Sequence, residues 1–358
     1  MTSKLFSLLQ IKSIILKNRI VISPMCQYSA HNGFANDWHL VHLGARAIGG
    51  AGLIIQEATA VSPEGRITPE DLGIWSDEHI EKLKQITSFI LTENAIPGIQ
   101  LAHAGRKAST SPPWQERRML TEAENGWQTL APSAIPYYDN NPHPPKEMTR
   151  EDIQKVIQDF KDATRRAHEA CYKVLEIHAA HGYLIHQFLS PLCNNRTDEY
   201  GGSFENRIRL LLEILEAVKT EWPNDLPLFV RISGTDWAPG GWDIDESVKL
   251  AKILKEKGVD VVDCSSGGAV HHQKIPVTPG YQVPIAERIK KEAGIHTGAV
   301  GLITNAHQAE EVLYREQADL VFFARESLRD PNIGLNFAHE LKADIIWPKQ
   351  YERAQLED

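Results

Sequence analysis

Short apolar runs alternate with longer amphipathic segments along most of the chain. Eight runs stand out, at positions 19–23, 52–57, 98–102, 174–178, 228–232, 259–264, 298–301 and 320–324. Between them the apolar residues recur with a period near 3.6, which is the spacing of a helix that buries one face. The pattern therefore predicts short buried strands that alternate with helices.

The helical segments carry end signals as well as periodicity. Positions 151–170 have the clearest helical pattern, and Thr149 with Asp152 forms the sequence of a capping box at its start. Gly258 and Gly294 each stand just before an apolar run, where a helix is expected to stop. These signals predict a parallel sheet covered by helices.

Eight strand–helix repeats favour closure of that sheet into a (β/α)8 TIM barrel. An open doubly wound sheet is the alternative, and it is weakened because no GxGxxG follows an early strand. We expect a single domain over 1–358, with a C-terminal tail at 343–358. Positions 106–150 break the repeat and contain seven of the 20 prolines. We expect a long loop there after the third strand, either a surface excursion or a lid over the catalytic face.

The composition excludes several classes of function. The formal net charge is −9 and no basic run exceeds two residues, so neither nucleic acid nor an anionic membrane is an expected partner. The four cysteines are widely spaced and form no CxxC pair, which favours a reduced cytoplasmic protein over a disulfide-rich secreted one. No apolar run approaches the ~18 residues of a membrane span.

Two imidazoles and a phenol follow the fourth apolar run within six residues, as His178, His181 and Tyr183. The active sites of barrels lie at the carboxyl ends of the strands, so we expect this group on the catalytic face. Such a neutral cluster can bind a carbonyl oxygen and deliver a proton beside it. A structural histidine pair and a metal site are alternatives, although no carboxylate or cysteine nearby completes a metal site.

The last two apolar runs predict a phosphate site. Gly301 ends the seventh run and Ala324 with Arg325 ends the eighth, where barrels of this kind commonly bind phosphate through backbone N–H groups. Arg231 stands inside an apolar strand, so it faces an anion or forms a structural ion pair. A phosphate at one end and an anion over the barrel centre suggest one long ligand, and FMN meets that description. Gln100 could pair with the flavin pyrimidine or be an ordinary polar strand residue.

Together these residues resemble the old yellow enzyme family of FMN-dependent ene-reductases, and most of all its bacterial NADPH dehydrogenase, or thermophilic-like, branch. The resemblance covers essentially the whole chain. It is carried by LKNRI at 16–20, SPMCQY at 23–28, EGRIT at 64–68, QLAHAGRK at 100–107, HAAHGYL at 178–184, NRTDEYGGS at 195–203 and GAVGLIT at 298–304. The related members with iron–sulfur and dinucleotide domains do not match, because the chain lacks their cysteine cluster.

The resemblance implies two sets of site residues and no metal. FMN is expected to be bound by Ser23, Pro24, Met25, Cys26, Ala58, Gln100, Arg231, Gly301, Ala324 and Arg325. The substrate is expected to be bound by Tyr28, His178, His181 and Tyr183, and by Arg353 of a neighbouring subunit in a homodimer or homotetramer. Cys26 marks the branch, whereas Ala324 departs from the glycine that usually precedes the phosphate-binding arginine.

The resemblance also implies a reaction with two halves in one site. NADPH or NADH reduces FMN, and an α,β-unsaturated carbonyl compound or a nitro compound then binds in its place. His178 and His181 bind the substrate oxygen, flavin N5 gives hydride to the β-carbon, and Tyr183 gives a proton to the α-carbon. Two rivals stay open from the residues alone. One is a metal-dependent barrel hydrolase that uses His103 with the histidine pair, and the other is a non-catalytic barrel that binds a phosphorylated ligand.

Overall fold

The computed structural model describes residues 3–116, 118–138 and 143–355. Within these ranges eight parallel strands close into a barrel in the order β10-β11-β12-β3-β4-β5-β8-β9. They are β3 (Ile20–Ile22), β4 (Leu53–Ala60), β5 (Ile96–Ala102), β8 (Val174–Ala179), β9 (Leu228–Ser233), β10 (Val261–Ser265), β11 (His296–Ala299) and β12 (Leu320–Phe323). The predicted TIM barrel is confirmed, and the open doubly wound sheet is wrong.

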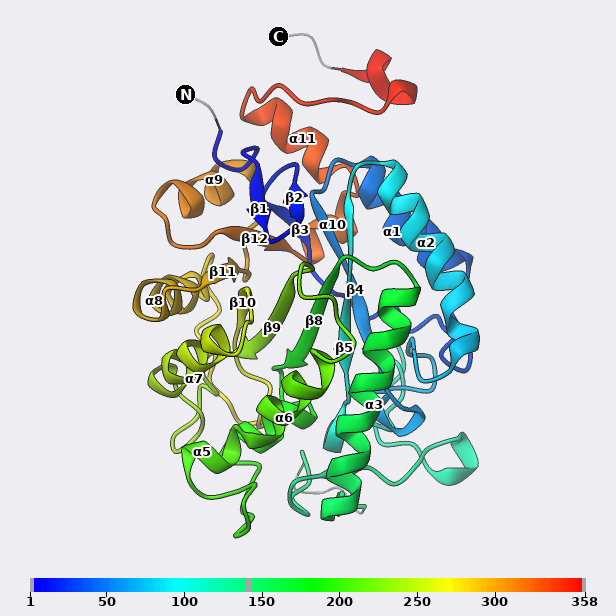
Figure 1. Ribbon diagram of the computed structural model, residues 1–358, viewed down its shortest axis with the longest axis vertical. Helices are drawn as coiled ribbons and strands as arrows, with labels where there is room; N and C mark the ends of the chain where they lie inside the picture. Colours follow the sequence, from blue (N-terminus) through cyan, green and yellow to red (C-terminus); the bar gives the residue numbers. More distant parts are fainter. Residues whose placement is uncertain (1–2, 117, 139–142, 356–358) are drawn as a thin grey trace.

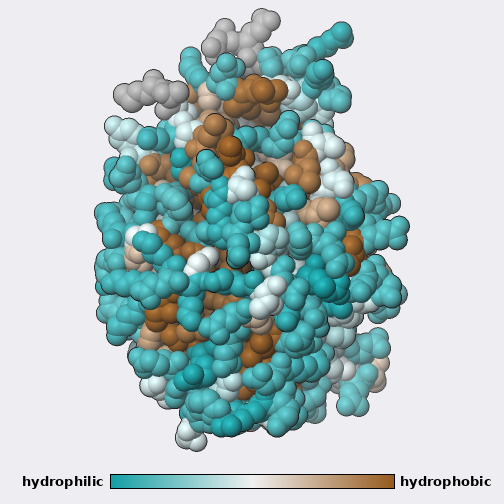
Figure 2. All heavy atoms as spheres, viewed as in Figure 1, coloured by the Kyte–Doolittle hydropathy of each residue, from teal (hydrophilic) through white to brown (hydrophobic). Residues whose placement is uncertain are grey.

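Helices connect successive strands and surround the barrel (Figure 1). The longer ones are α1 (Asp37–Ile48), α2 (Ile80–Thr92), α3 (Arg150–Glu169), α6 (Arg209–Val218), α7 (Ile244–Glu256), α8 (Val283–Ala293), α9 (Ala306–Tyr314) and α11 (Ile333–Glu340). Three short helices are α4 (Leu184–Leu189), α5 (Phe204–Arg207) and α10 (Arg325–Arg329). Seen from the same side, the surface is mainly hydrophilic, with apolar residues visible between the polar ones (Figure 2). No helix in the described ranges has both the length and the apolar character that a membrane crossing requires.

The predicted helix ends are present as hydrogen bonds and backbone angles. Thr149 Oγ1 accepts from the backbone N–H of Asp152 at 3.2 Å, and the Asp152 carboxylate accepts from the Thr149 N–H at 3.0 Å, so the capping box starts α3. Gly294 ends α8 with φ of 63°, and Gly258 follows α7 with φ of 84°. A left-handed residue at these positions turns the chain out of the helix and into the next strand.

Two features of the strands differ from the prediction. β4 continues to Ala60, three residues past the predicted end, so Glu57 lies inside a strand, beside a register shift between Gln56 and Ala58. A hairpin of β1 (Leu9–Ile11) and β2 (Ile14–Leu16) precedes the barrel and was not predicted, because its strands are only three residues long.

The barrel has an apolar interior at one end and helices packed on its outside. Side chains alternate between the two faces of each strand. One set of strand residues packs with the hairpin and fills the interior: Val21, Leu53, Ile55, Val174, Phe229, Val261, Leu320 and Phe322. The alternate set, which includes Ile22, Ile177, Ile232 and Phe323, packs with apolar helix residues. The hairpin therefore covers one mouth of the barrel, which leaves the carboxyl ends of the strands for a site.

The excursion after β5 is held by hydrogen bonds within itself and to the turn after β4. It contains a parallel pair of short strands, β6 (Leu130–Ala131) and β7 (Lys146–Glu147). Arg106 Nη1 donates to the carbonyl oxygen of Ile135 at 3.0 Å, and Trp127 Nε1 donates to that of Glu64 at 2.9 Å. Positions 117 and 139–142 of the predicted excursion, and 356–358 of the predicted tail, lie outside the described residues.

Candidate active site

A cluster of polar and charged side chains lies inside the barrel, one layer above the apolar end. We call Gln100, Glu176, Arg231 and Asp263 the barrel-axis cluster. Each stands two residues after an interior position of its strand and is at most 5% exposed. Gln100 Nε2 donates to Glu176 Oε1 at 2.7 Å, and Arg231 Nε lies 3.0 Å from Asp263 Oδ2. Arg231 therefore forms an ion pair with Asp263, and its charge also opposes the rise in the pKa of Glu176.

The barrel-axis cluster is short of hydrogen-bond donors. Oε2 of Glu176 and both carboxylate oxygens of Asp263 are buried and accept no hydrogen bond within the described chain. Burial, followed by the proximity of Asp263, raises the pKa of Glu176, and burial raises the pKa of Asp263 against the opposing effect of Arg231. Because buried polar groups normally find partners, such orphaned oxygens indicate a strained or functional region.

The residues predicted to bind FMN converge on this end of the barrel. Ser23 follows β3 and its Oγ accepts from Arg231 Nη2 at 3.2 Å, while Gln100 uses Nε2 on Glu176, which leaves Oε1 for a ring N–H of a ligand. Pro24, Met25 and Cys26 continue from Ser23, and Ala58 lies on neighbouring β4. Arg231 thus contacts both Ser23, which is predicted to bind FMN, and the carboxylate of Asp263.

The predicted phosphate residues follow neighbouring strands. Gly301 comes after β11 and Ala324 after β12, and these two strands pair. Gly301 has φ of 120°, and a Cβ there would lie 2.8 Å from Gln282 Nε2 and 3.1 Å from the Tyr281 ring. The bare backbone forms a cradle that a side chain would fill, as a phosphate site requires. Arg325 is exposed at the start of α10. These residues fit FMN.

The two predicted histidines lie in contact just beyond the barrel-axis cluster. His178 lies one residue before the end of β8, and its Nε2 lies 3.3 Å from His181 Nδ1, with the rings nearly perpendicular at 87°. His178 Nδ1 accepts from the backbone N–H of Ala180 at 3.2 Å, so its hydrogen is on Nε2. His181 Nδ1 then accepts from His178, and His181 Nε2 donates to Ser265 Oγ at 2.7 Å.

Both histidines are neutral near pH 7. Burial, with the nearby Arg231 charge as the next cause, lowers the pKa of His178 and of His181 well below the usual value. Neutral rings with hydrogen on Nε2 can donate to an oxygen without carrying a charge of their own. The metal alternative has no support here, because no group of three or more His, Cys, Asp or Glu side chains in the described part of the chain could bind a metal ion.

Tyr183 lies beside the histidine pair in an otherwise apolar setting. Its ring centroid is 5.0 Å from that of His178, and Lys107 Nζ lies 5.2 Å from the Tyr183 ring. The ring packs against a buried apolar group that also contacts Tyr28 and Cys26. A cavity of about 80 Å³ lies next to this region and is lined by Arg106, Lys107, Thr110, Arg118, Met119, Tyr137 and Tyr138. The first part of the excursion therefore borders the predicted site.

Cys26 is a protonated thiol at neutral pH. Part of the side chain is exposed, but burial of the thiol raises its pKa well above the usual value, and the nearby carboxyl groups of Asp71 and Glu57 raise it further. A neutral thiol is a weak hydrogen-bond donor rather than a nucleophile.

Two predicted residues are not brought to the site within this chain. Arg353 lies in the exposed turn η5 (Lys349–Ala354), at the end of the molecule near α11 and away from the carboxyl end of β8 (Figure 1). His103 is buried, and its Nδ1 accepts from the backbone N–H of Gly105 at 3.0 Å. Burial lowers the pKa of His103 to about 4, so it is a neutral histidine with a structural hydrogen bond.

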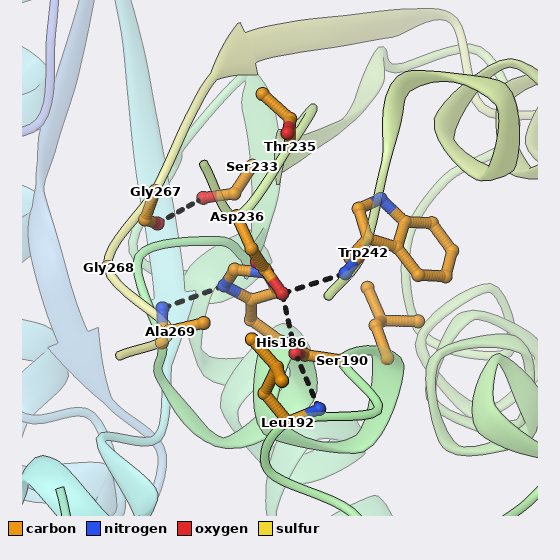
Figure 3. A network of polar contacts seen from close by, with 12 residues as sticks. His186, Ser190, Leu192, Ser233, Thr235, Asp236, Trp242, Gly267, Gly268 and Ala269 are labelled. Carbon is orange, nitrogen blue, oxygen red and sulfur yellow. Dashed lines mark hydrogen bonds and ion pairs between the residues drawn. The ribbon is translucent and has the colours of Figure 1, made fainter. Parts of the chain in front are cut away.

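The sequence did not single out several residues that shape the site. Glu176 stands two residues before His178, and Asp263 interrupts the apolar run at 259–264, so polarity inside a buried strand was the available signal. His186 and Asp236 gave no such signal, because they lie after the strands, in a helix and a loop where polar residues are common. Their nitrogen and oxygen atoms, Nε2 and Oδ1, lie 2.9 Å apart in the network of Figure 3.

The turn between the two predicted catalytic residues has an uncommon backbone. His181 has φ of 59° and Gly182 has φ of 71°. A left-handed conformation costs a non-glycine residue roughly 1–2 kcal/mol, so surrounding contacts must stabilise His181 in this form. A Cβ on Gly182 would lie 1.9 Å from the carbonyl oxygen of Gly268, which restricts that position to glycine.

Comparison with known proteins identifies the family to which the chain belongs. Residues 4–344 match the model of the NADH:flavin oxidoreductase / NADH oxidase family. The chain is 52% identical to the NADPH dehydrogenase of Bacillus subtilis (strain 168) over 355 residues, which covers 99% of each chain. It is also 52% identical to the NADPH dehydrogenase of Geobacillus thermodenitrificans (strain NG80-2), again over 99% of each chain.

Solved structures give the same picture at lower identity. Morphinone reductase in complex with tetrahydroNAD matches with a TM-score of 0.77 and 27% identity, over 96% of this chain and 92% of that one. The old yellow enzyme homologue from Zymomonas mobilis matches with a TM-score of 0.76 and 26% identity, over 96% of this chain and 94% of that one. The likeness therefore extends over nearly the whole length of both structures.

Proposed function

The chain belongs to the NADH:flavin oxidoreductase / NADH oxidase family, and on that premise we propose that it is an ene-reductase of the old yellow enzyme type. Membership makes it a flavin-dependent oxidoreductase that uses FMN and NAD(P)H and acts on a small molecule. The proposed step is reduction of the C=C bond of an α,β-unsaturated carbonyl compound. The observation that supports it most directly is a neutral histidine pair with a phenol beside it.

The barrel-axis cluster and the strand ends would bind FMN. Ser23, Gln100 and Arg231 would contact the ring system, with Pro24, Met25, Cys26 and Ala58 along its edge, and Gly301, Ala324 and Arg325 would bind the phosphate. Arg231 is suited to the negative charge that develops on the pyrimidine end. FMN supplies hydride transfer to the β-carbon when it is bound, and the protein supplies orientation and field.

The histidine pair would bind the substrate oxygen. Charge grows on a carbonyl oxygen as hydride reaches the β-carbon. The Nε2–H groups of His178 and His181 would turn from His181 Nδ1 and Ser265 Oγ to this oxygen and stabilise it without a positive charge of their own. Loss of one donor of this kind typically costs about 10²–10³ in rate. Tyr28 would line the same space, and segment 106–150 would act as a lid that limits water.

Tyr183 would donate the proton to the α-carbon, opposite the flavin. We expect Tyr183→Phe to slow enone reduction by about 10²–10⁴-fold, because general acid catalysis is usually worth that much. Reduction of FMN by NADPH needs no such proton and should stay within about threefold of the parent rate. Stopped-flow measurement of each half-reaction separates the two effects. Equal slowing of both halves would show that Tyr183 is a packing residue.

We also propose that the tail completes the site of a second copy. Arg353 is exposed in this chain, as are Ile346 at 96% and Tyr351 at 41%, and such a tail is costly for an isolated chain to order. In a two-fold dimer, or in a tetramer built from such dimers, the tails would be exchanged reciprocally. Truncation after Lys349 should raise the KM for the enone and leave FMN bound. A monomer in sedimentation experiments at working concentration would contradict the shared site.

A further inference from the structure

The turn that separates His181 from Tyr183 is fixed from one side by two adjacent side chains of α4. The backbone N–H of Gly182 donates to His186 Nδ1 at 2.8 Å. The carbonyl oxygen of Gly182 accepts from Gln187 Nε2 at 2.7 Å. His186 and Gln187 are both 0% exposed, so neither bond competes with water. Both polar backbone groups of one glycine are therefore bound by neighbouring residues of a single helix.

Asp236 decides which nitrogen of His186 can accept. His186 Nδ1 must present a lone pair to the Gly182 N–H, so the hydrogen of the neutral ring is on Nε2. Nε2 lies 2.9 Å from Asp236 Oδ1, where a carboxylate favours that tautomer. The close-up view shows His186 pointing at Asp236 from one side while Ser190 and Trp242 approach from the other (Figure 3).

Asp236 is itself oriented by two donors. Its Oδ2 accepts from Ser190 Oγ at 2.6 Å and from the backbone N–H of Trp242 at 2.8 Å. Burial alone would raise the pKa of Asp236, but the His186 ring and the hydrogen bonds from Ser190 and Trp242 keep it below the usual value. Oδ2 of the carboxylate thus accepts two hydrogen bonds, and Oδ1 has the ion-pair contact with His186 Nε2.

Further contacts fix His181 on the other side of the turn. Its backbone N–H donates to Ser233 Oγ at 2.9 Å, and Ser233 Oγ donates to the carbonyl oxygen of Gly267 at 2.7 Å. Lys107 Nζ donates to the carbonyl oxygens of His181 and Gly268 at 2.8 and 3.2 Å. These contacts join the turn to the loop after β10, whereas Gln187 of α4 joins Gly182 to Ala104 and Arg106 after β5.

We propose that His186 and Gln187, with Asp236 behind them, are positioning residues that fix the left-handed Gly182 turn and thereby set the placement of the His181 ring and the Tyr183 phenol. We call these three residues the α4 clamp. The inference rests on the proposed roles of His181 and Tyr183. The α4 clamp touches neither substrate nor cofactor, so it acts only through the turn.

Asp236→Asn tests the α4 clamp with little change in shape. The Trp242 N–H can only donate, so the amide oxygen of the new side chain takes the Oδ2 position and its NH₂ faces His186 Nε2. That donor drives the ring hydrogen to Nδ1, where it opposes the Gly182 N–H. Reversal of a histidine tautomer by the same substitution is strongly inhibitory in the serine protease triad.

The expected result separates the two half-reactions. Enone reduction and the affinity for a phenol probe should fall by roughly tenfold to a hundredfold, because misplacement of reacting groups by about 1 Å has that cost. FMN content and reduction of FMN by NADPH should not change. Nitrogen NMR of ¹⁵N-histidine-labelled, FMN-free protein should show His186 as the Nε2–H form in the parent and the Nδ1–H form in the variant.

A second substitution distinguishes positioning from packing. In His186→Asn/Asp236→Asn the asparagine amide can turn its oxygen toward the Gly182 N–H, so enone reduction should recover most of the rate lost in Asp236→Asn. If Asp236→Asn does not fold, Gln187→Met removes the donor to the Gly182 carbonyl, together with the bonds to the Ala104 carbonyl oxygen and from the Arg106 N–H, and should also slow enone reduction selectively. The proposal is overturned by an Nδ1–H ring in the parent. It is also overturned by unchanged enone and phenol data in a folded clamp variant, or by a double variant no faster than the single.

These outcomes are independent of the test of Tyr183. If Tyr183→Phe leaves enone reduction intact, the proposed proton donor is wrong, yet the tautomer measured in FMN-free protein still decides whether Asp236 fixes His186. If the tautomer is as expected and only the kinetic effect is missing, the α4 clamp fails and the proposed function stands.

Discussion

Two buried clusters that contain charged side chains lie near the same histidine pair. Their carboxyl groups differ in how many hydrogen-bond and ion-pair partners they have. In the barrel-axis cluster, Glu176 Oε1 accepts a hydrogen bond and Asp263 Oδ2 lies 3.0 Å from Arg231 Nε, but the other two carboxyl oxygens have neither kind of partner in the described chain. In the α4 clamp, Asp236 Oδ2 accepts two hydrogen bonds and Oδ1 lies 2.9 Å from His186 Nε2. The difference indicates that the first cluster is prepared for a ligand, whereas the second is a scaffold.

The direction of the pKa shifts agrees with this contrast. The carboxyl groups of the barrel-axis cluster have raised pKa values because burial outweighs the single arginine. The pKa of Asp236 is lowered although it is equally buried. Burial alone therefore does not decide the ionisation of a carboxyl group in this protein. The ionisation depends on how many hydrogen-bond donors and positive charges reach the carboxyl group.

The largest effect is expected from loss of Arg231, which forms the ion pair with Asp263 in the barrel-axis cluster. Arg231→Met should lower the free energy of unfolding of the FMN-free protein by about 3–5 kcal/mol, as removal of one partner of a buried ion pair usually does. It should also abolish stable FMN binding. Urea denaturation and a flavin titration measure the two losses. Arg46→Met is a suitable control, because Arg46 is equally buried but bonds only to carbonyl oxygens.

A matched pair of aspartates gives the next largest effect. Asp236→Asn should lower the free energy of unfolding by about 1.5–3 kcal/mol, because its hydrogen bonds no longer involve a charged group. Asp263→Asn should lower it by about 3–5 kcal/mol, because it removes the charged partner that lies 3.0 Å from the buried Arg231 guanidinium. Both values come from denaturation of the FMN-free proteins. A loss in Asp263→Asn no larger than that in Asp236→Asn would contradict the contrast between the two clusters.

The smallest effect is expected from two serines. Ser190→Ala removes a 2.6 Å hydrogen bond to Asp236 and should cost about 1 kcal/mol of unfolding free energy. Ser23→Ala removes a 3.2 Å bond from Arg231 and should cost about half as much in the FMN-free protein. Only Ser23→Ala should weaken FMN, which a flavin titration of both variants would measure. A larger loss of unfolding free energy in Ser23→Ala than in Ser190→Ala would contradict the contrast between the two clusters.

The barrel could be predicted because each strand is an apolar run with clear borders. Gly258 and Gly294 mark helix ends locally, and the capping box at Thr149 involves residues only three apart, so neither depends on the rest of the fold. The histidine pair and Tyr183 could be placed together for the same reason. The β1–β2 hairpin was missed because three-residue strands give no periodicity to read.

The contacts that support the site could not be predicted, because they depend on the barrel closing. Gln100 meets Glu176, and Arg231 meets Asp263, only when β5 pairs with β8 and β9 pairs with β10. Lys107 reaches the carbonyl oxygen of His181 across 74 positions of sequence. The second strand was predicted to end at Glu57, the charged residue that closes the apolar run at 52–57. That carboxyl group is instead buried, and burial raises its pKa.

The contact between Gly182 and Gly268 has a consequence for how this enzyme can change. A Cβ on Gly182 would lie 1.9 Å from the Gly268 carbonyl oxygen, and a Cβ on Gly268 would lie 2.4 Å from the His181 carbonyl carbon. Neither loop can accept a side chain there unless the other retreats. We therefore expect the loops that contain Gly182 and Gly268 to change together during evolution. A laboratory library that randomises either loop alone will consist mostly of inactive members, whereas one that varies both together can reach new substrate specificities.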